Sequence, residues 1–67
     1  MSPPYRPTYE MVVQDASGNE TPVGYFERLD EASAFARTSE LVEDKNVLLY
    51  KYVKAEDTYK PYDKWSY

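Results

Sequence analysis

The spacing of apolar residues along the chain predicts a single helix, at residues 29–43. Asp30 stands where the N-cap of this helix is expected. Phe35 is the one large side chain of the apolar face, so this face suits close packing on a flat β-sheet. Its members recur every three or four positions, the spacing of one helix face: Ala32, Phe35, Ala36, Ser39 and Val42.

Three further runs, residues 9–14, 23–28 and 47–55, have the composition and alternation typical of strands. Turn-forming residues at 15–19 predict a hairpin between the first two. Pro22 cannot donate to a sheet ladder and is expected at the start of a strand or on an edge. The order ββαβ predicts an α+β fold: a three-stranded antiparallel sheet, its first strand in the middle, with one helix packed on one face.

The last strand leaves two choices of the face that meets the helix. In this strand Lys51 shares a face with Leu49 and Val53. Because a lysine rarely points into the core, we expect the other face, which includes Leu48 and Tyr50, to meet the helix. The face away from the helix would then carry an apolar patch, and such a patch usually marks an interaction site. Its members would be Val12, Phe26, Leu49 and Val53.

Two segments flank the predicted domain at residues 9–55. Residues 1–8 are rich in proline and are expected to be extended and mobile; residues 4–7 match a PxxP ligand. Residues 56–67 form an aromatic tail with Tyr59, Tyr62 and Trp65. We expect this tail to fold back over the apolar patch. The alternatives are that the tail is a binding arm, or that the patch drives self-association.

Composition removes most enzyme chemistry from consideration. The 67 residues include no Cys and no His, so a cysteine nucleophile and a histidine general base are both missing. The two glycines do not form a phosphate-binding loop. Acidic pairs at residues 30–31 and 43–44 lack the spacing of a calcium loop. We therefore expect a non-enzymatic protein without cofactor or metal.

The acidic charge is concentrated in one part of the chain. The net charge is −4, and residues 10–44 alone hold nine acidic and two basic residues. Such a surface disfavours direct binding to nucleic acid and favours a basic protein partner. An acidic surface that only keeps the protein soluble is the alternative. The acidic candidates for partner contact are Glu31, Glu40, Glu43 and Asp44.

The segment VGYFERLDEASAFA, residues 23–36, carries a resemblance to a known family. Together with the size, the acidity and the ββαβ order, its LDEA helix start resembles the small host RNA polymerase inhibitor of T7-like bacteriophages. The resemblance covers residues 9–54 and implies an acidic surface, with an arginine-bearing strand, that engages the polymerase. Arg28 is the arginine nearest to the matching place. More broadly, the chain is similar to small acidic phage inhibitors of the anti-CRISPR type.

These observations predict a phage-type inhibitor that binds a host nucleic-acid machine, an RNA polymerase or a CRISPR effector, by protein contact. We expect a monomer or homodimer in the host cytoplasm, with no signal peptide and no membrane segment. The alternative is an assembly protein, such as a minor virion subunit, that uses an exposed sheet face or edge.

Overall fold

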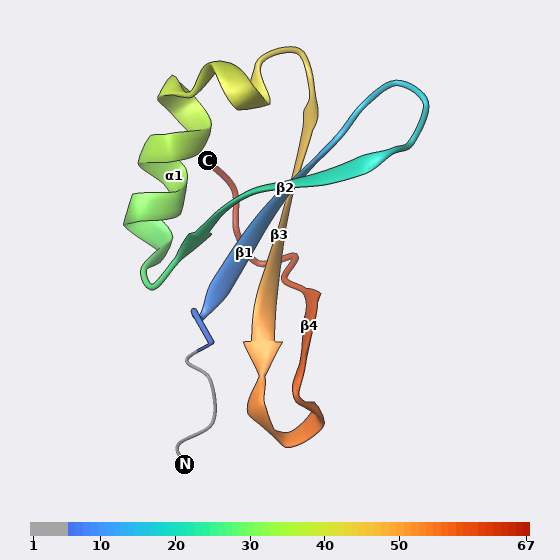
Figure 1. The fold of residues 1–67 in the computed structure, drawn as a ribbon. Helices are drawn as coiled ribbons and strands as arrows, with labels where there is room; N and C mark the ends of the chain where they lie inside the picture. The colour runs from blue at the N-terminus through green and yellow to red at the C-terminus, as the bar shows by residue number, and fades with distance from the viewer. Residues whose placement is uncertain (1–5) are drawn as a thin grey trace.

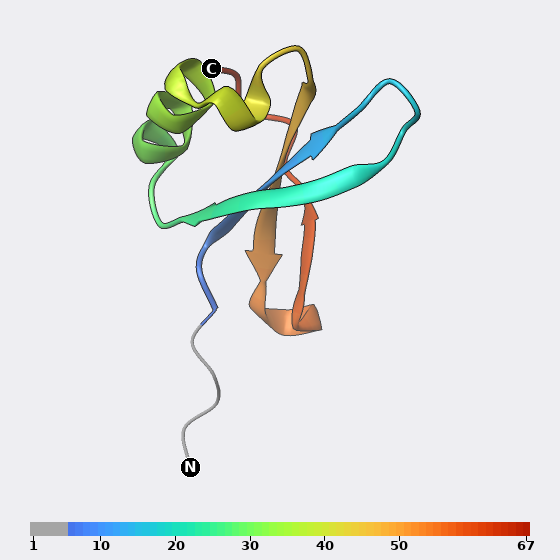
Figure 2. The same cartoon turned by 45° about the horizontal axis from the view of Figure 1, so that its top comes forward.

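The computed structural model describes residues 6–67, and these form an α+β fold. A four-stranded antiparallel sheet has the order β2-β1-β3-β4, and helix α1 packs against one side of it (Figures 1 and 2). The α+β class and the central place of the first strand are confirmed. The elements are β1 (Tyr9–Gln14), β2 (Glu20–Phe26), α1 (Leu29–Thr38), η1 (Glu40–Val42), β3 (Asn46–Val53), η2 (Lys54–Glu56) and β4 (Thr58–Pro61).

The prediction of three strands is wrong by one strand, because β4 lies within the segment predicted as a tail. The 3₁₀ turn η2 and Asp57, with a left-handed φ of 49°, reverse the chain after β3. β4 then pairs with the second half of β3, from Tyr50 opposite Pro61 to Val53 opposite Thr58. Pro61 ends this strand, which is only four residues long and lies on an edge, where proline is tolerated.

Helix α1 ends five residues before its predicted end, and its N-cap is Arg28 rather than Asp30. The Thr38 hydroxyl donates to the Ala34 carbonyl at 2.7 Å, and Ser39 Oγ accepts from the Leu41 N–H at 3.1 Å. Ser39 itself is extended. Hydroxyl side chains that bond to nearby backbone groups compete with helical hydrogen bonds, which explains the change to the 3₁₀ turn η1.

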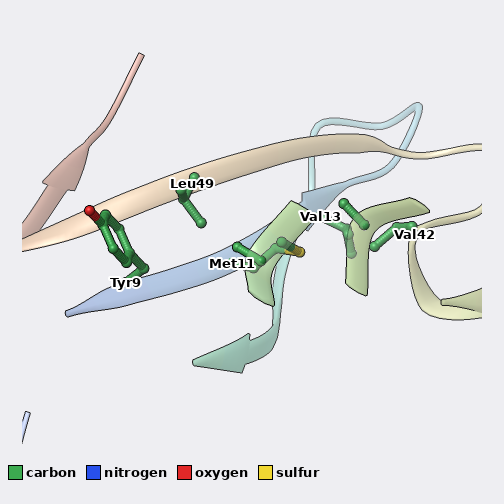
Figure 3. Packing of buried hydrophobic residues seen from close by; sticks show 7 residues of the cluster. Tyr9, Met11, Val13, Val42 and Leu49 are labelled. Carbon is green, nitrogen blue, oxygen red and sulfur yellow. The ribbon is translucent and has the colours of Figure 1, made fainter. Parts of the chain in front are cut away.

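The buried core lies between α1 and the sheet. Met11 is fully buried and stands opposite Leu49 of β3 and Gly24 of β2. Val42, from η1, closes the core beside Val13 (Figure 3). The predicted helix residues Ala32 and Ala36 are buried, while Phe35 is only partly buried. The core cluster consists of Tyr9, Met11, Val13, Ala32, Ala36, Val42 and Leu49.

The predicted face of β3 is wrong: Leu49 faces α1, and Leu48 and Tyr50 lie on the other side of the sheet. Leu49 is 3% exposed and belongs to the core cluster. Lys51 lies on the same side of β3 as Leu49, and its ammonium is 5.6 Å from the centre of the Tyr62 ring. A lysine can therefore occupy the helix-facing side of an interior strand while its charged end stays at the surface.

Phe26 also lies on the helix side, because its ring packs 5.4 Å from the ring of Phe35. The predicted apolar patch of Phe26, Leu49 and Val53 on the open face therefore does not form. Val12 does face away from α1, between Pro22 and Leu48 in register, and is only 4% exposed.

The C-terminal segment folds back, but onto the helix side of the sheet. The Tyr62 N–H donates to the Leu49 carbonyl at 2.8 Å, and the Tyr62 ring lies 5.7 Å from that of Tyr9. Trp65 Nε1 donates to Ser33 Oγ of α1 at 2.9 Å. The C-terminus accordingly lies beside α1 (Figures 1 and 2). Tyr62 and Trp65 thus cover apolar residues on the face opposite to the predicted one, while Tyr59, paired with Tyr52, lies on the other face.

At the N-terminal end, Pro7 and Thr8 are held against the sheet. The Tyr59 hydroxyl donates to the Pro7 carbonyl at 2.6 Å, and the Tyr52 N–H donates to the Thr8 carbonyl at 2.8 Å. Thr8 Oγ1 also donates to Glu27 at 3.0 Å. The PxxP pattern lies partly outside the described residues, since these begin at Arg6.

Candidate functional site

The sheet face away from α1 carries a group of tyrosines, one or two from each of three strands. We call this surface the tyrosine face. Within the described residues it comprises Tyr25 of β2, Tyr50 and Tyr52 of β3, and Tyr59 of β4. Glu10 lies on β1, between β2 and β3, and is paired in register with Tyr25 on one side and Tyr50 on the other.

The tyrosine face is concave. β2 and β4 are the two edge strands, separated by β1 and β3. Neighbouring strands are about 4.8 Å apart, so three such spacings separate the backbones of the two edge strands. The rings of Tyr25 and Tyr59 are nevertheless 6.2 Å apart, and those of Tyr52 and Tyr59 are 5.4 Å apart. The rings of the two edge strands therefore lean toward each other over this face, which also carries a depression.

Each hydroxyl of the tyrosine face donates to an acceptor nearby, and three of the four acceptors are carboxylates. The four bonds are Tyr25 to Glu10 (2.8 Å), Tyr50 to Glu20 (2.9 Å), Tyr52 to Asp57 (2.6 Å) and Tyr59 to the Pro7 carbonyl (2.6 Å). These bonds fix the ring positions, because a tyrosine held at both ends keeps few alternative rotamers.

The carboxylates make the phenols harder to ionise. The hydrogen bonds to Glu10, Glu20 and Asp57 raise the pKa values of their partner tyrosines above 10.0. Burial is the main cause that raises the pKa of Tyr59. At neutral pH this face therefore presents uncharged aromatic rings next to negative carboxylates.

A depression of about 350 Å³ lies on this face. Tyr50, Tyr52 and Tyr59 line it together with two carboxylates, those of Glu10 and Asp57. Arg6 lines it as well, with its Nε 3.9 Å from Asp57 Oδ1. The depression thus combines aromatic rings, negative charge and one guanidinium.

The aromatic and apolar residues predicted from the sequence are not brought together into one site. Tyr59 lies on the tyrosine face. Tyr62 and Trp65 pack against the core on the opposite side, with Phe26 and Leu49. Val53 is partly buried at the end of β3 and lies on the helix side, as Lys51 does.

The predicted acidic residues are all exposed, but they do not form one uniform negative surface. Glu40, Glu43 and Asp44 line a shallow depression after the end of α1. Arg37 and Lys45 line the same depression, so its charge is mixed. Glu31 lies in the first turn of α1, at the other end of the helix.

Sequence reasoning missed most of the tyrosine face, namely Tyr25, Tyr50 and Tyr52 with their carboxylate partners. A usable signal was present in β1, where Glu10 and Gln14 share a face with Val12. A strand face that carries a carboxylate and an amide favours neighbours with hydroxyls over purely aliphatic neighbours. Tyr50 and Tyr52 belong beside Glu10 on that argument, and Leu49 belongs in the core.

Within residues 6–67, no group of three or more acidic side chains is placed to hold a metal ion. The same residues contain no helix that is long and apolar enough to cross a membrane. No protein-family model, curated protein or solved structure matches the chain. The candidate site therefore rests on the geometry of the chain itself.

Proposed function

We propose that this chain is a non-enzymatic, phage-type inhibitor that binds a host nucleic-acid machine through its tyrosine face. The resemblance of residues 23–36 to phage polymerase inhibitors suggests the class of partner. The observation that carries the proposal is the concave face itself, where four ordered tyrosines stand beside the carboxylates of Glu10, Glu20 and Asp57.

The composition of this face suits protein recognition. Tyrosine is enriched at protein interfaces because it offers a large contact area with few rotatable bonds. The hydrogen bonds of the hydroxyls hold the rings in place before binding, which lowers the entropic cost of association. Negative charge beside the rings favours a basic partner and speeds the encounter with it. Enzymes that bind nucleic acid carry such basic surfaces, because they neutralise phosphates.

Inhibition assays with matched charge variants test this proposal. The targets are a purified bacterial RNA polymerase in run-off transcription and a CRISPR effector nuclease in DNA cleavage. One variant carries Glu20→Lys and Asp57→Lys on the tyrosine face; its control carries Glu31→Lys and Glu43→Lys near α1. Each substitution replaces a negative charge by a positive one and raises the net charge by two, so both variants shift the net charge from −4 to zero.

We expect the parent to inhibit one of the two machines. The tyrosine-face variant should lose about tenfold or more in potency, whereas the control should stay within about twofold. Equal losses in both variants would show that only net charge matters. Failure of the parent against both machines would contradict the proposed partner class.

A second candidate function is self-assembly through a sheet edge. β3 has eight residues, but β4 pairs only with its second half. The first half therefore has an edge without a strand partner in the described part of the chain, apart from the Tyr62 bond to Leu49. A shallow, mainly apolar depression of about 190 Å³ lies beside it. Light scattering on the purified chain distinguishes a closed ring or filament from the expected monomer or dimer.

A further inference from the structure

Arg6 occupies an unusual position at the depression on the tyrosine face. The chain enters the sheet at Pro7 and Thr8, which are both held by hydrogen bonds, and this places Arg6 at the edge of the depression. Its positive charge is close enough to lower the pKa values of Tyr25, Tyr52 and Tyr59, although other causes raise them further. Arg6 also lines the same depression as the three phenol rings of Tyr50, Tyr52 and Tyr59.

The contact of Arg6 with its carboxylate is weak. Arg6 Nε and Asp57 Oδ1 are 3.9 Å apart, beyond the range of a charge-assisted hydrogen bond. The two side chains are 51% and 71% exposed. An exposed pair of this geometry contributes little to stability, so another cation can displace Arg6 easily.

The carboxylates of the depression retain acceptor capacity. Glu10 accepts the Tyr25 hydroxyl through Oε2, and Asp57 accepts the Tyr52 hydroxyl through Oδ1. The second oxygen of each carboxylate receives no hydrogen bond from the residues that the structure describes. A guanidinium presents five N–H donors in a planar fork and can also stack on aromatic rings. Both kinds of partner are present around this depression.

We propose that the depression is a binding site for an arginine side chain of an extended basic segment in the partner protein. In the free protein the chain's own Arg6 takes this place loosely, and the partner's arginine displaces it. This inference rests on the proposed function, of which it names the recognised group. Arginine is favoured over lysine because an ammonium has no planar fork and stacks less well on tyrosine.

Peptide binding to the full chain tests the site without the host machine. The probe is a short capped peptide with several arginines; matched peptides carry lysine or the neutral isostere citrulline at the same positions. Titration calorimetry compares the parent with Arg6→Ala, with Asp57→Asn in the Arg6→Ala chain, and with Glu31→Gln as a control far from the site. Arg6, Asp57 and Glu31 are exposed, and a thermal melt checks that each variant folds.

We expect Arg6→Ala to bind the arginine peptide about 3- to 10-fold more tightly than the parent, because the competing guanidinium is gone. Asp57→Asn should reverse most of this gain, and Glu31→Gln should have no effect. Binding to lysine peptide should be at least about threefold weaker, and citrulline peptide should not bind. Unchanged or weaker binding by Arg6→Ala, or equal binding of the arginine and lysine peptides, would overturn the proposal.

The proposed function and this inference fail in different ways. If the parent inhibits a host machine but no arginine peptide binds to Arg6→Ala, the inference alone is wrong. If the peptides bind as expected but neither machine is inhibited, the proposed function alone is wrong. A parent that is a dimer and an Arg6→Ala variant that is a monomer would assign the depression to Arg6 of a second copy, and would also overturn the inference.

Discussion

The contact between Trp65 and α1 makes the stability of the fold depend on its C-terminal segment. Trp65 is partly buried against the core cluster, and its Nε1 donates to Ser33 Oγ at 2.9 Å. Ser33 is the buried polar residue of the helix, at 9% exposed. Removal of the indole therefore deletes both apolar contact and the bond that satisfies this hydroxyl.

The size of the effect follows from these two contributions. A tryptophan buries about 150–250 Å² when fully covered. Half of that area, at about 25 cal/mol per Å², contributes roughly 2–3 kcal/mol. The hydrogen bond adds about 1 kcal/mol. Trp65→Ala should thus lower the free energy of unfolding by about 3–4 kcal/mol, out of a total of about 3–10 kcal/mol for a domain of 67 residues.

Urea unfolding followed by circular dichroism measures this loss, and a double-mutant cycle separates its parts. Trp65→Phe keeps much of the apolar area and should cost about 1–2 kcal/mol. Ser33→Ala should cost about 1 kcal/mol in the parent and almost nothing in the Trp65→Phe chain, because the bond is already lost. A Trp65→Ala chain that unfolds at the parent's urea concentration would refute the covering role of the tail. Additive effects of Ser33→Ala and Trp65→Phe would refute the bond.

Two further predictions concern the core and the tyrosine face. Met11→Ala should cost about 2–5 kcal/mol because Met11 is fully buried, while Phe35→Ala should cost less because Phe35 is partly buried at the edge of the core; urea midpoints that rank the other way would contradict this core. The tyrosines of the tyrosine face have pKa values raised above 10.0 in the folded state, so the stability they contribute is fully present below that pH and is lost as pH rises through the folded values. Urea midpoints at pH 8 and pH 11 should therefore differ, and Tyr50→Phe should reduce the difference; an equal pH dependence in parent and variant would contradict the role of these hydroxyl bonds.

The hydrophobic pattern was sufficient to predict the class of the fold, the middle position of β1 and the helix residues Ala32 and Ala36. It could not predict the face of β3, since both alternating sets contain large apolar residues. The face predicted from Lys51 was wrong because the long side chain of a lysine can extend from an interior strand over a neighbouring ring, here that of Tyr62. The tyrosines needed acceptors for their hydroxyls, and this requirement is a better guide to the face than one charge.

The tyrosine face depends on contacts between distant parts of the chain. Glu20 and Tyr50 are 30 positions apart, and Tyr59 and Pro7 are 52 apart. Such pairs follow from the strand order and from the presence of β4, a short strand that ends in proline and has no strong pattern of its own. Without that strand Tyr59 has no assigned face, and the concave surface cannot be derived.

Hydroxyl-radical footprinting of the chain, alone and mixed with each of the two proposed target machines, tests the proposed role of the tyrosine face most directly. Tyr25 and Tyr67 serve as matched reporters, since each is 52% exposed in the free protein. Tyr25 lies on the tyrosine face, whereas Tyr67 lines the depression with Glu40 and Glu43, the rival acidic surface. We predict that the partner protects Tyr25 from oxidation and leaves Tyr67 unchanged. Protection of Tyr67 with Tyr25 still reactive would place the interface at the end of α1 and contradict the account.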